Sequence, residues 1–334
     1  MLVDPTELRR HGLRFSSDDE PGLRRRRRGK RFTYVDVDGA TGSEADRRRL
    51  DALAVPPAWT DVWLCADERG HVQATGRDAR GRKQYRYHPE WRALRDRRKF
   101  GDLATFGAAL PELRARIDRD LRRPGIDHDK MVALVLALLD STLIRVGNDE
   151  YARTNGTYGL TTLTRRHLVA DHGRVRFRFV GKAGLRHEVE IDDRRLARLV
   201  RRCHELGGRE LFSFVDDDGP HRVDSADAND YLRAVCGDDH SVKTFRTWGA
   251  TALAVGLLAA TADDVVADAD ARMSEVVDAV ATRLGNTRAV ARSSYIHPEV
   301  VDWHGGGLIA EAWRRSRSTR TMDRSERTLV SLLS

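Results

Sequence analysis

The stretch HLVADHGRVRFRFVGKAGLRHEVEI, residues 167–191, decides the fold class of the larger part of the chain. Polar and apolar residues alternate through it, as they do in strands with one buried face. The segments DHG and GKAG interrupt the alternation and are typical of turns. The stretch therefore predicts a three-stranded β meander, with Lys182 at the tip of its second hairpin, where a side chain can project into a bound ligand.

Helical patterns surround this meander. From about residue 104 onward, apolar residues recur at helical spacing in segments such as FGAALPELRARIDRDL, KMVALVLALLDSTLIRV and RRLARLVRRCHEL. We therefore expect residues 98–334 to form a mainly α-helical domain that contains the meander.

The preceding part of the chain has a different pattern. Residues 32–97 have the composition of short strands and glycine-marked turns, as in FTYVDVDG, DVWLCADERGHVQATG and RKQYRYH. The charged segment WRALRDRRKFGD (91–102) is the predicted connection between domains. The expected fold class is α+β, with a small N-terminal antiparallel β-rich domain in residues 1–97 and a larger, mainly helical domain in residues 98–334.

Composition excludes several classes of protein. A chain of 334 residues with 40% hydrophobic content has room for two cores, and a mean hydropathy of −0.56 excludes a membrane protein. The N-terminus has no apolar stretch typical of a signal peptide, so we expect a cytoplasmic protein. Cys65, Cys203 and Cys236 are far apart and odd in number, which predicts neither disulfides nor a cysteine-based zinc site.

The charge balance indicates a polyanionic partner. The formal net charge is +8 and the pI is about 9.7, and clustered basic residues gain affinity for DNA or RNA by displacing counterions. The run RRRRRGKR at 24–31 strengthens this interpretation, although such a run can equally be a solvated arm.

Lysine is rare among the basic residues. Of 59 basic residues only six are lysines, at positions 30, 83, 99, 130, 182 and 243. A lysine in such a chain is a candidate for proton transfer, because a guanidinium stays charged at any accessible pH. The alternative for each single lysine is chance.

The segment RKQYRYH allows two interpretations. Alternation places Lys83, Tyr85 and Tyr87 on one face of a strand and the other side chains on the opposite face. This basic and aromatic mixture suits a nucleic-acid groove, but an ordinary strand with one aromatic face in the core has the same pattern. The candidate nucleic-acid contacts are Arg82, Lys83, Gln84, Tyr85, Arg86 and Tyr87.

Metal and serine chemistries find no support in the sequence. The acidic DDDG at 216–219 is typical of a turn, no histidine pair has metalloprotease spacing, and neither a GxSxG motif nor a phosphate-binding loop is present. We therefore expect neither a metal nor a cofactor, and the remaining candidates are cationic side chains and one tyrosine.

Two basic motifs have possible structural roles as well as chemical ones. In RVGNDEYARTNGTYGLTTL (145–163), Arg145 is expected to close a long apolar helix that Gly147 caps, where an arginine can simply interact with the helix dipole. In KTFRTW (243–248), Lys243 and Arg246 are three apart and should share a helical face, which is usually just solvated.

The candidate tyrosine lies in NTRAVARSSYIHP (286–298). Held between basic residues, Tyr295 can be a core anchor, a phosphate contact or a nucleophile. An unbroken helix would place Asn286 and Tyr295 on opposite faces, at 100° per residue. Both can reach one phosphate only if the chain breaks between them, and the serines at 293–294 are the natural place.

Taken together, these motifs resemble the type IB DNA topoisomerases of the poxvirus and bacterial kind. The resemblance rests on RVGNDEYARTNGTYGLTTL, GKAG, KTFRTWGAT and LGNTRAVARSSYIHP in the family's order and spacing, extends more weakly through GRKQYRYH, and covers roughly residues 20–333. Viral members carry histidine where this chain has Asn286, and either side chain can donate a hydrogen bond to a phosphate oxygen.

The resemblance implies an enzyme that relaxes duplex DNA through a 3′-phosphotyrosyl intermediate, acting as a monomer without ATP, metal or cofactor. It implies an active-site set of Arg145, Lys182, Arg246, Asn286 and Tyr295, with Lys243 assisting. Two alternatives remain. A tyrosine recombinase uses the same chemistry but usually has H-x-x-R where this chain has Lys243 to Arg246, and an inactive DNA-binding protein would not need the full set.

Overall fold

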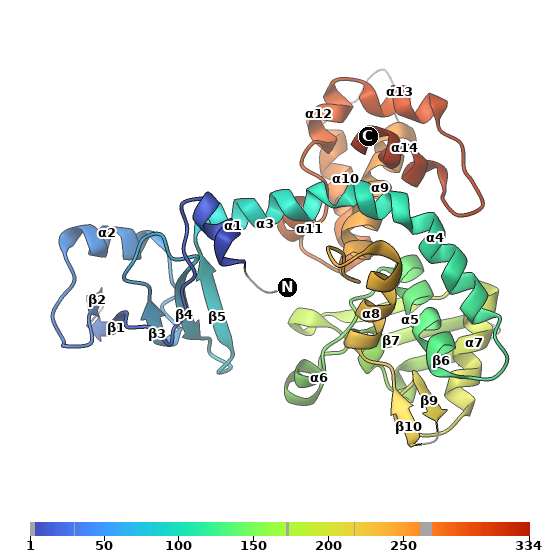
Figure 1. Cartoon of the computed structure of the whole chain (residues 1–334), viewed down its shortest axis with the longest axis horizontal. Helices are drawn as coiled ribbons and strands as arrows, with labels where there is room; N and C mark the ends of the chain where they lie inside the picture. The colour runs from blue at the N-terminus through green and yellow to red at the C-terminus, as the bar shows by residue number, and fades with distance from the viewer. Residues whose placement is uncertain (1–3, 30, 172–173, 217, 261–268) are drawn as a thin grey trace. The chain divides into compact units, whose positions relative to one another are not determined.

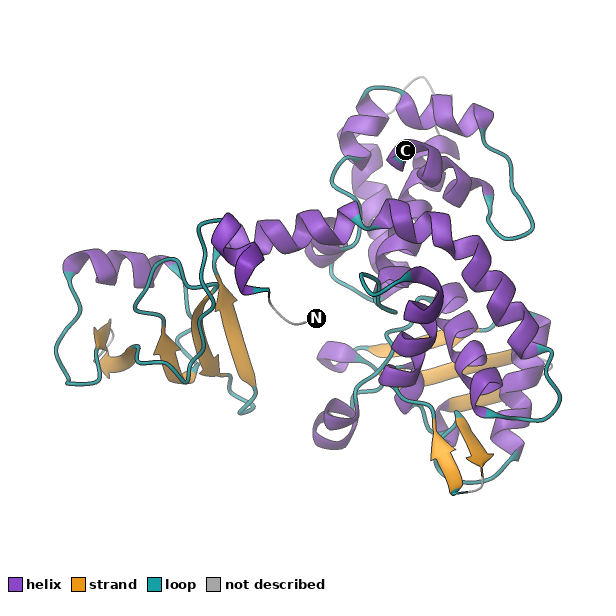
Figure 2. Cartoon of the chain, viewed as in Figure 1, coloured by secondary structure: helices purple, strands orange, loops and turns teal. Residues whose placement is uncertain are grey.

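The chain divides into two compact units, Met1–Arg98 and Lys99–Ser334. The computed structural model describes residues 4–29, 31–171, 174–216, 218–260 and 269–334. The first unit holds a five-stranded antiparallel sheet, and the second is mainly helical with a three-stranded antiparallel sheet (Figures 1 and 2). The predicted α+β fold class is therefore confirmed.

The sheet of the first unit has the strand order β2-β1-β3-β4-β5, so β5 is an edge strand. All its pairings are antiparallel, with register shifts in the β3·β4 and β4·β5 pairs. Its strands are β1 (Leu23–Arg28), β2 (Arg31–Val35), β3 (Thr60–Leu64), β4 (Val72–Arg77) and β5 (Lys83–Tyr87), and its helices are α1 (Pro5–Arg10), α2 (Glu44–Ala52) and most of α3 (Pro89–Gly101).

The basic run at 24–31 forms a hairpin, which corrects its interpretation as an arm. Arg24 to Arg28 are β1, paired with β2 across a turn whose Lys30 lies outside the described residues. The guanidinium of Arg25 donates to the carbonyls of residues 55, 56 and 59 and lies 4.3 Å from the centroid of the Phe32 ring. These carbonyls and the strand pairing hold an arginine-rich segment in a sheet that its composition alone does not predict.

Helix α2 also went unpredicted, because the sequence between residues 32 and 97 was interpreted as strands and turns only. Its start is fixed by a capping box, in which the Asp46 amide donates to the Ser43 hydroxyl at 3.0 Å and the Ser43 amide donates to the Asp46 carboxylate at 3.2 Å. Leu50 is its one buried residue, so the apolar periodicity that reveals longer helices is missing.

The core of the second unit forms around two helices that are apolar on nearly all sides. Helices α5 (His128–Thr142) and α9 (Thr244–Ala260) bury most of their residues, as expected of helices without a polar face. Neighbouring helices cover them, including α4 (Leu103–Leu121), α10 (Ala269–Leu284) and α14 (Arg324–Leu333).

The predicted meander is present and lies against this core. Its strands are β6 (Leu168–Asp171), β7 (Arg174–Val180) and β8 (Arg186–Glu190), in the order β6-β7-β8 with antiparallel pairing. Val175, Phe177 and Phe179 are buried, so the apolar side of the alternation faces the core. Two residues of the predicted DHG turn, 172 and 173, lie outside the described residues.

Shorter elements complete the second unit. A hairpin of β9 and β10 surrounds the predicted DDDG turn, of which residue 217 is not described. The further elements are α6 (Asp149–Asn155), α7 (Arg194–Glu205), β9 (Ser213–Asp216), β10 (Gly219–Arg222), α8 (Ser225–Cys236), α11 (Arg288–Ser294), α12 (Val300–Gly305) and α13 (Leu308–Arg315).

A charged network ties α14 to the core. The guanidinium of Arg114 on α4 contacts the Asp140 carboxylate at 2.7 Å and the Glu326 carboxylate at 2.7 Å, and the Trp248 indole N–H donates to Glu326 at 2.9 Å. Burial alone would raise the pKa of Glu326, but Arg114 and Trp248 outweigh it and lower that pKa. The network connects four helices, α4, α5, α9 and α14.

Replacing Glu326 by alanine should lower the free energy of unfolding by about 3 kcal/mol, because it leaves the half-buried Arg114 with one counterion instead of two. Chemical denaturation followed by tryptophan fluorescence measures this. Glu311→Ala is the matched control, since its pair with Arg315 is exposed and should contribute under about 0.5 kcal/mol. Because the pKa of Glu326 is lowered in the folded state, its contribution should be lost as the pH falls through that pKa. Equal losses in both variants would contradict the assignment.

Candidate active site

Arg145 lies just beyond the end of α5, not at its last turn. The helix ends at Thr142, and Leu143 takes a left-handed conformation with φ of 57°. This corrects the expectation that Arg145 closes the helix and Gly147 caps it. The strained Leu143 is stabilised by packing, because its side chain is buried against Gly249 of α9 so closely that a Cβ added to Gly249 would lie 2.7 Å from it.

The backbone around Arg145 is fixed by the segment that follows α6. The Leu160 amide donates to the Arg145 carbonyl at 2.8 Å, and the Thr161 amide donates to the Val146 carbonyl at 2.7 Å. Only glycine fits at position 159, because a Cβ there would lie 2.5 Å from both the Arg145 carbonyl oxygen and the Gly147 nitrogen. The motif at 145–163 thus folds back on itself and holds Arg145 in place.

Arg246 joins three segments from the first turn of α9. Its side chain is 5% exposed and donates to the Leu143 carbonyl at the end of α5 and to the Leu284 carbonyl at the end of α10, the latter at 3.0 Å. Lys243, by contrast, is exposed and lies in the turn before α9. The two residues therefore do not share a helical face as the sequence spacing suggested.

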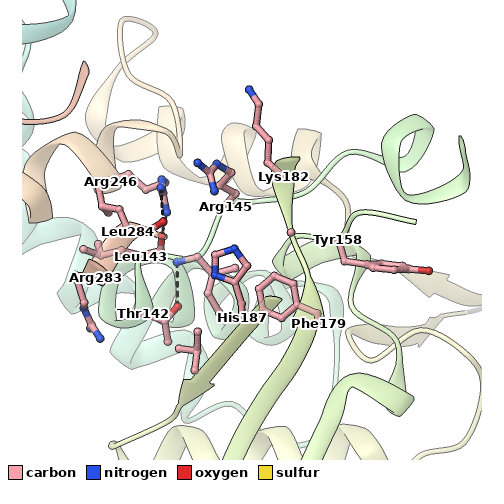
Figure 3. A pocket seen from close by; sticks show the side chains of 13 residues that line it. Thr142, Leu143, Arg145, Tyr158, Phe179, Lys182, His187, Arg246, Arg283 and Leu284 are labelled. Atoms are coloured by element: carbon pink, nitrogen blue, oxygen red, sulfur yellow. Dashed lines mark hydrogen bonds between the residues drawn. The ribbon is translucent and has the colours of Figure 1, made fainter. Parts of the chain in front are cut away.

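Lys182 lies at the tip of the β7–β8 hairpin, in a short 3₁₀ turn at Lys182–Gly184. The turn is closed by the Gly181 amide, which donates to the Leu185 carbonyl at 2.7 Å, and Ala183 in it has φ of 68°. Figure 3 shows the Lys182 side chain beside that of Arg145, and the two line one pocket together with Arg246. The structure thus brings together three of the predicted site residues from distant parts of the sequence.

Asn286 and Tyr295 stand at the two ends of α11. Helix α10 ends at Leu284, Gly285 turns the chain with φ of 58°, and Asn286 precedes the helix while Tyr295 caps its C-terminal end. Asn286 and Tyr295 therefore both lie just outside α11, one before its start and one after its end. The serines at 293–294, where a break in the helix was expected, are the last two residues of α11. The Asn286 side-chain oxygen accepts a hydrogen bond from Arg145.

The phenol of Tyr295 lies in a positively charged environment. Its ring centroid is 5.0 Å from the Arg246 guanidinium, and its side chain is partly buried against the core. Burial would raise the pKa of the phenol, but the charges of Arg246 and Arg145 and the nearby Asn286 amide outweigh burial and lower it. This environment makes the phenol easier to deprotonate than an ordinary tyrosine.

Two polar nitrogens beside Tyr295 are buried and have no hydrogen-bond partner among the described residues. They are Nε of Arg246 and Nδ2 of Asn286. A buried donor without an acceptor costs about 1–3 kcal/mol, so an acceptor that entered here would bind favourably. A phosphate group offers such oxygens, and arginine and amide nitrogens are suited to bind them.

His187 is a residue of this site that sequence reasoning missed. Its ring stacks on Phe179 with centroids 5.0 Å apart and lies against two glycines, since a Cβ added to Gly181 or Gly285 would come within 2.6 or 2.2 Å of it. Burial, and then the charges of Arg145 and Arg246, lower the pKa of His187. The ring thus packs between Gly181, beside Lys182, and Gly285, beside Asn286, and it lines the same pocket as Lys182 and Arg145 (Figure 3). The only signal in the sequence was its inward place in the alternation of β8.

In the first unit, three predicted nucleic-acid contacts are already paired with acidic side chains. The Lys83 ammonium lies 2.7 Å from the Asp18 carboxylate, and the Gln84 amide nitrogen donates to the Asp78 carboxylate at 3.0 Å. Arg82 also pairs with Asp78, at 2.6 Å. Their availability to a ligand is lower than the sequence suggested.

The other predicted contacts on β5 divide between surface and core. Tyr85 is 43% exposed, and its ring stacks on that of Tyr87 with the two centroids 5.8 Å apart. Tyr87 is half-buried and packs beside buried hydrophobic residues. The Arg86 guanidinium donates to the Ala54 carbonyl at 2.8 Å and faces the Trp59 ring. Tyr87 and Arg86 thus support the interpretation as an ordinary strand, whereas Tyr85 remains on the surface.

The described residues contain no group of three or more histidine, cysteine, aspartate or glutamate side chains placed to hold a metal ion. Within the same ranges, no helix combines the length and the apolar character needed to cross a membrane.

Comparisons with known proteins give two family matches. Residues 88–304 match the eukaryotic DNA topoisomerase I catalytic core, and residues 31–78 match the N-terminal domain of bacterial DNA topoisomerase IB. The first match alone covers more than half of the chain, and it contains the residues from Arg145 to Tyr295 that form the candidate active site.

Individual relatives agree with these matches. The chain is 30% identical over 285 residues to DNA topoisomerase 1B of Acanthamoeba polyphaga mimivirus, which covers 82% of this chain and 85% of that protein. It is 25% identical over 177 residues to DNA topoisomerase 1B of Vaccinia virus (strain Copenhagen), which covers 51% of this chain and 52% of the viral one.

Proposed function

Since the chain belongs to the type IB DNA topoisomerases, we propose that it relaxes supercoiled duplex DNA through a transient covalent bond between Tyr295 and one DNA strand. The family prediction made from the sequence motifs is confirmed, and the chain is a DNA topoisomerase I enzyme. The observation that carries the proposed mechanism is the phenol of Tyr295 beside Arg246, where one donor nitrogen each of Arg246 and Asn286 has no partner within the described part of the chain.

In the proposed cleavage step, the phenolic oxygen of Tyr295 releases its proton to solvent water and attacks a backbone phosphorus. The bond from phosphorus to the 5′ oxygen breaks, and the 3′ end of the cut strand stays on the tyrosine. Negative charge grows on the two non-bridging oxygens, and fixed donors from Arg145, Arg246 and Asn286 stabilise it. Lys182 gives a proton to the departing 5′ oxygen, which a guanidinium cannot do.

Resealing is the reverse reaction. The free 5′ hydroxyl attacks the phosphotyrosyl phosphorus and gives its proton to Lys182, and Tyr295 leaves as a phenolate that regains a proton from solvent water. Because the phosphotyrosyl bond conserves the energy of the broken phosphodiester, this step needs no ATP. Between the two steps the cut strand rotates about the intact one, which releases supercoils.

A plasmid relaxation assay in EDTA without ATP tests this proposal. We expect negatively supercoiled plasmid to become a ladder of relaxed topoisomers and a covalent protein–DNA adduct to appear on denaturing gels. DNA binding without relaxation would instead identify an inactive DNA-binding protein, and joined products from two different DNA duplexes would favour a recombinase. We further propose a monomer with two domains that clamp the duplex, acting on DNA in the cytoplasm.

The first unit is the proposed second half of that clamp. Arg24, Arg26 and Arg28 are exposed at alternate positions of β1 and so project to one side of the strand, where they can contact phosphates. With Lys83 and Gln84 paired to acidic residues, these arginines and Tyr85 are the strongest candidates for duplex contacts in this unit.

Deleting residues 1–88 should leave a fragment that folds, since residues 99–334 have their own core and α3 stays whole. The fragment should still form the Tyr295 adduct at low salt. Each lost phosphate contact should reduce the slope of log K against log salt by about 0.9, as measured by anisotropy titrations on duplex DNA. A fragment with an unchanged slope would show that the first unit does not grip the DNA.

A further inference from the structure

The last turn of α3 contacts the chain on both sides of Tyr295. The Lys99 ammonium donates to the Ser294 carbonyl at 3.0 Å and lies 4.1 Å from the centroid of the Phe100 ring. Phe100 is buried, and its ring meets that of His297 edge to face with centroids 5.2 Å apart. Neither Lys99 nor Phe100 belongs to the motifs that identified the site.

The Ser294 carbonyl is well placed to control the tyrosine. It belongs to the same peptide group as the Tyr295 amide nitrogen, and a peptide group is planar. A donor that fixes this oxygen therefore fixes the plane from which the Tyr295 side chain departs. Ser294 is also the last residue of α11, where carbonyls lack helical partners and a cation is favourable.

The peptide group on the other side of Tyr295 is held from α9. The Thr251 hydroxyl, which is fully buried, lies 3.1 Å from the Tyr295 carbonyl and 3.1 Å from the amide nitrogen of His297. The backbone of Tyr295 is thus held at two points, one from the core helix α9 and one from α3. Helix α3 is continuous from Pro89 to Gly101, so Lys99 stands on the helix that begins in the first unit.

We propose that Lys99 is a positioning residue for Tyr295, which fixes the Ser294–Tyr295 peptide and so aims the phenolic oxygen at the scissile phosphate. The proposal rests on the proposed role of Tyr295 as nucleophile. It also gives a function to one of the six lysines, because the Lys99 ammonium donates to a carbonyl at the end of a short helix.

Lys99→Met in the full chain tests the proposal, because methionine keeps the length of the side chain and removes the donor. With enzyme in excess over a duplex substrate at saturating concentration, we expect the rate of adduct formation to fall about tenfold. DNA affinity, measured in the Tyr295→Phe background, and the thermal midpoint should stay close to those of the parent. Lys99→Arg should recover most of the rate, since it restores a cationic donor.

Arg97→Met is the matched control, as it removes one exposed positive charge from the same helix and should leave the rate unchanged. An unchanged rate for Lys99→Met would overturn the proposal, as would a loss confined to affinity, which would make Lys99 a phosphate contact. A lower thermal midpoint of Lys99→Met with a normal rate of adduct formation would show that Lys99 has only a structural role. Absence of any adduct from the wild-type chain would instead refute the proposed function itself.

Discussion

Tyr295→Phe should abolish both plasmid relaxation and covalent adduct, with a fall in the cleavage rate of about 10⁴-fold or more. The substitution removes one oxygen atom and keeps the ring, so the contact with the Arg246 guanidinium and the packing of α11 are preserved. Duplex affinity should therefore remain near that of the wild type, because the donors that meet the phosphate are on other residues. Single-turnover cleavage and anisotropy binding measure the two quantities separately.

Tyr231→Phe provides the matched control for this experiment. Its hydroxyl donates to Asp120 at 2.6 Å, so the substitution also removes one buried tyrosine hydroxyl, but outside the candidate site. We expect a small loss of stability and normal relaxation. Relaxation by Tyr295→Phe near the wild-type level would exclude Tyr295 as the nucleophile.

The second large effect is expected for Lys182→Ala, which should slow cleavage of ordinary DNA by about 10²–10⁴-fold by removing the proton donor. A substrate with sulfur in place of the 5′ bridging oxygen should restore the rate, because a thiolate leaves without a proton. The exposed position of Lys182 at a hairpin tip is compatible with this role, since its side chain has room to reach the 5′ oxygen of a bound strand.

Lys243→Ala distinguishes the role of Lys243 from that proposed for Lys182. Lys243 is exposed in the turn before α9, so it can assist only through its positive charge. Its replacement should lower the cleavage rate modestly, and by the same factor on the oxygen and sulfur substrates. If Lys182→Ala is impaired equally on the oxygen and sulfur substrates, Lys182 is a phosphate clamp and another group supplies the proton.

Local patterns in the sequence predicted the parts of the fold that local patterns control. The meander followed from the alternation of RVRFRFV, and the buried side chains of Phe177 and Phe179 account for it. The hairpin at 24–31 was not predicted because the carbonyls that hold Arg25 in its strand belong to residues 55, 56 and 59. These residues are at least 30 positions away, so the local sequence around Arg25 does not indicate the contacts. Helix α2 was missed because it is short and buries one leucine.

The candidate site was predictable as a set of residues but not as a geometry. The motifs identified Arg145, Lys182 and Arg246 through family resemblance, whereas their convergence depends on backbone contacts such as that of Arg246 with the ends of α5 and α10. The expectation that Lys243 shares a helical face with Arg246 was wrong because Lys243 is exposed in the turn before α9, whereas Arg246 is buried. His187 escaped notice because its importance lies in its fit against Gly285, far along the chain.

The network around Arg114 has a consequence for the order in which a newly made chain can assemble. Trp248 and Glu326, which it joins, are separated by 78 positions. At a synthesis rate of about 5–20 residues per second, α9 waits roughly 4–16 s for its partner on α14. Tyr295 is made during that interval. The proposed nucleophile is therefore synthesised before α14, the helix that completes the core beside α9. A nascent chain carries Tyr295 before the network that supports α9, the helix of Arg246, is complete.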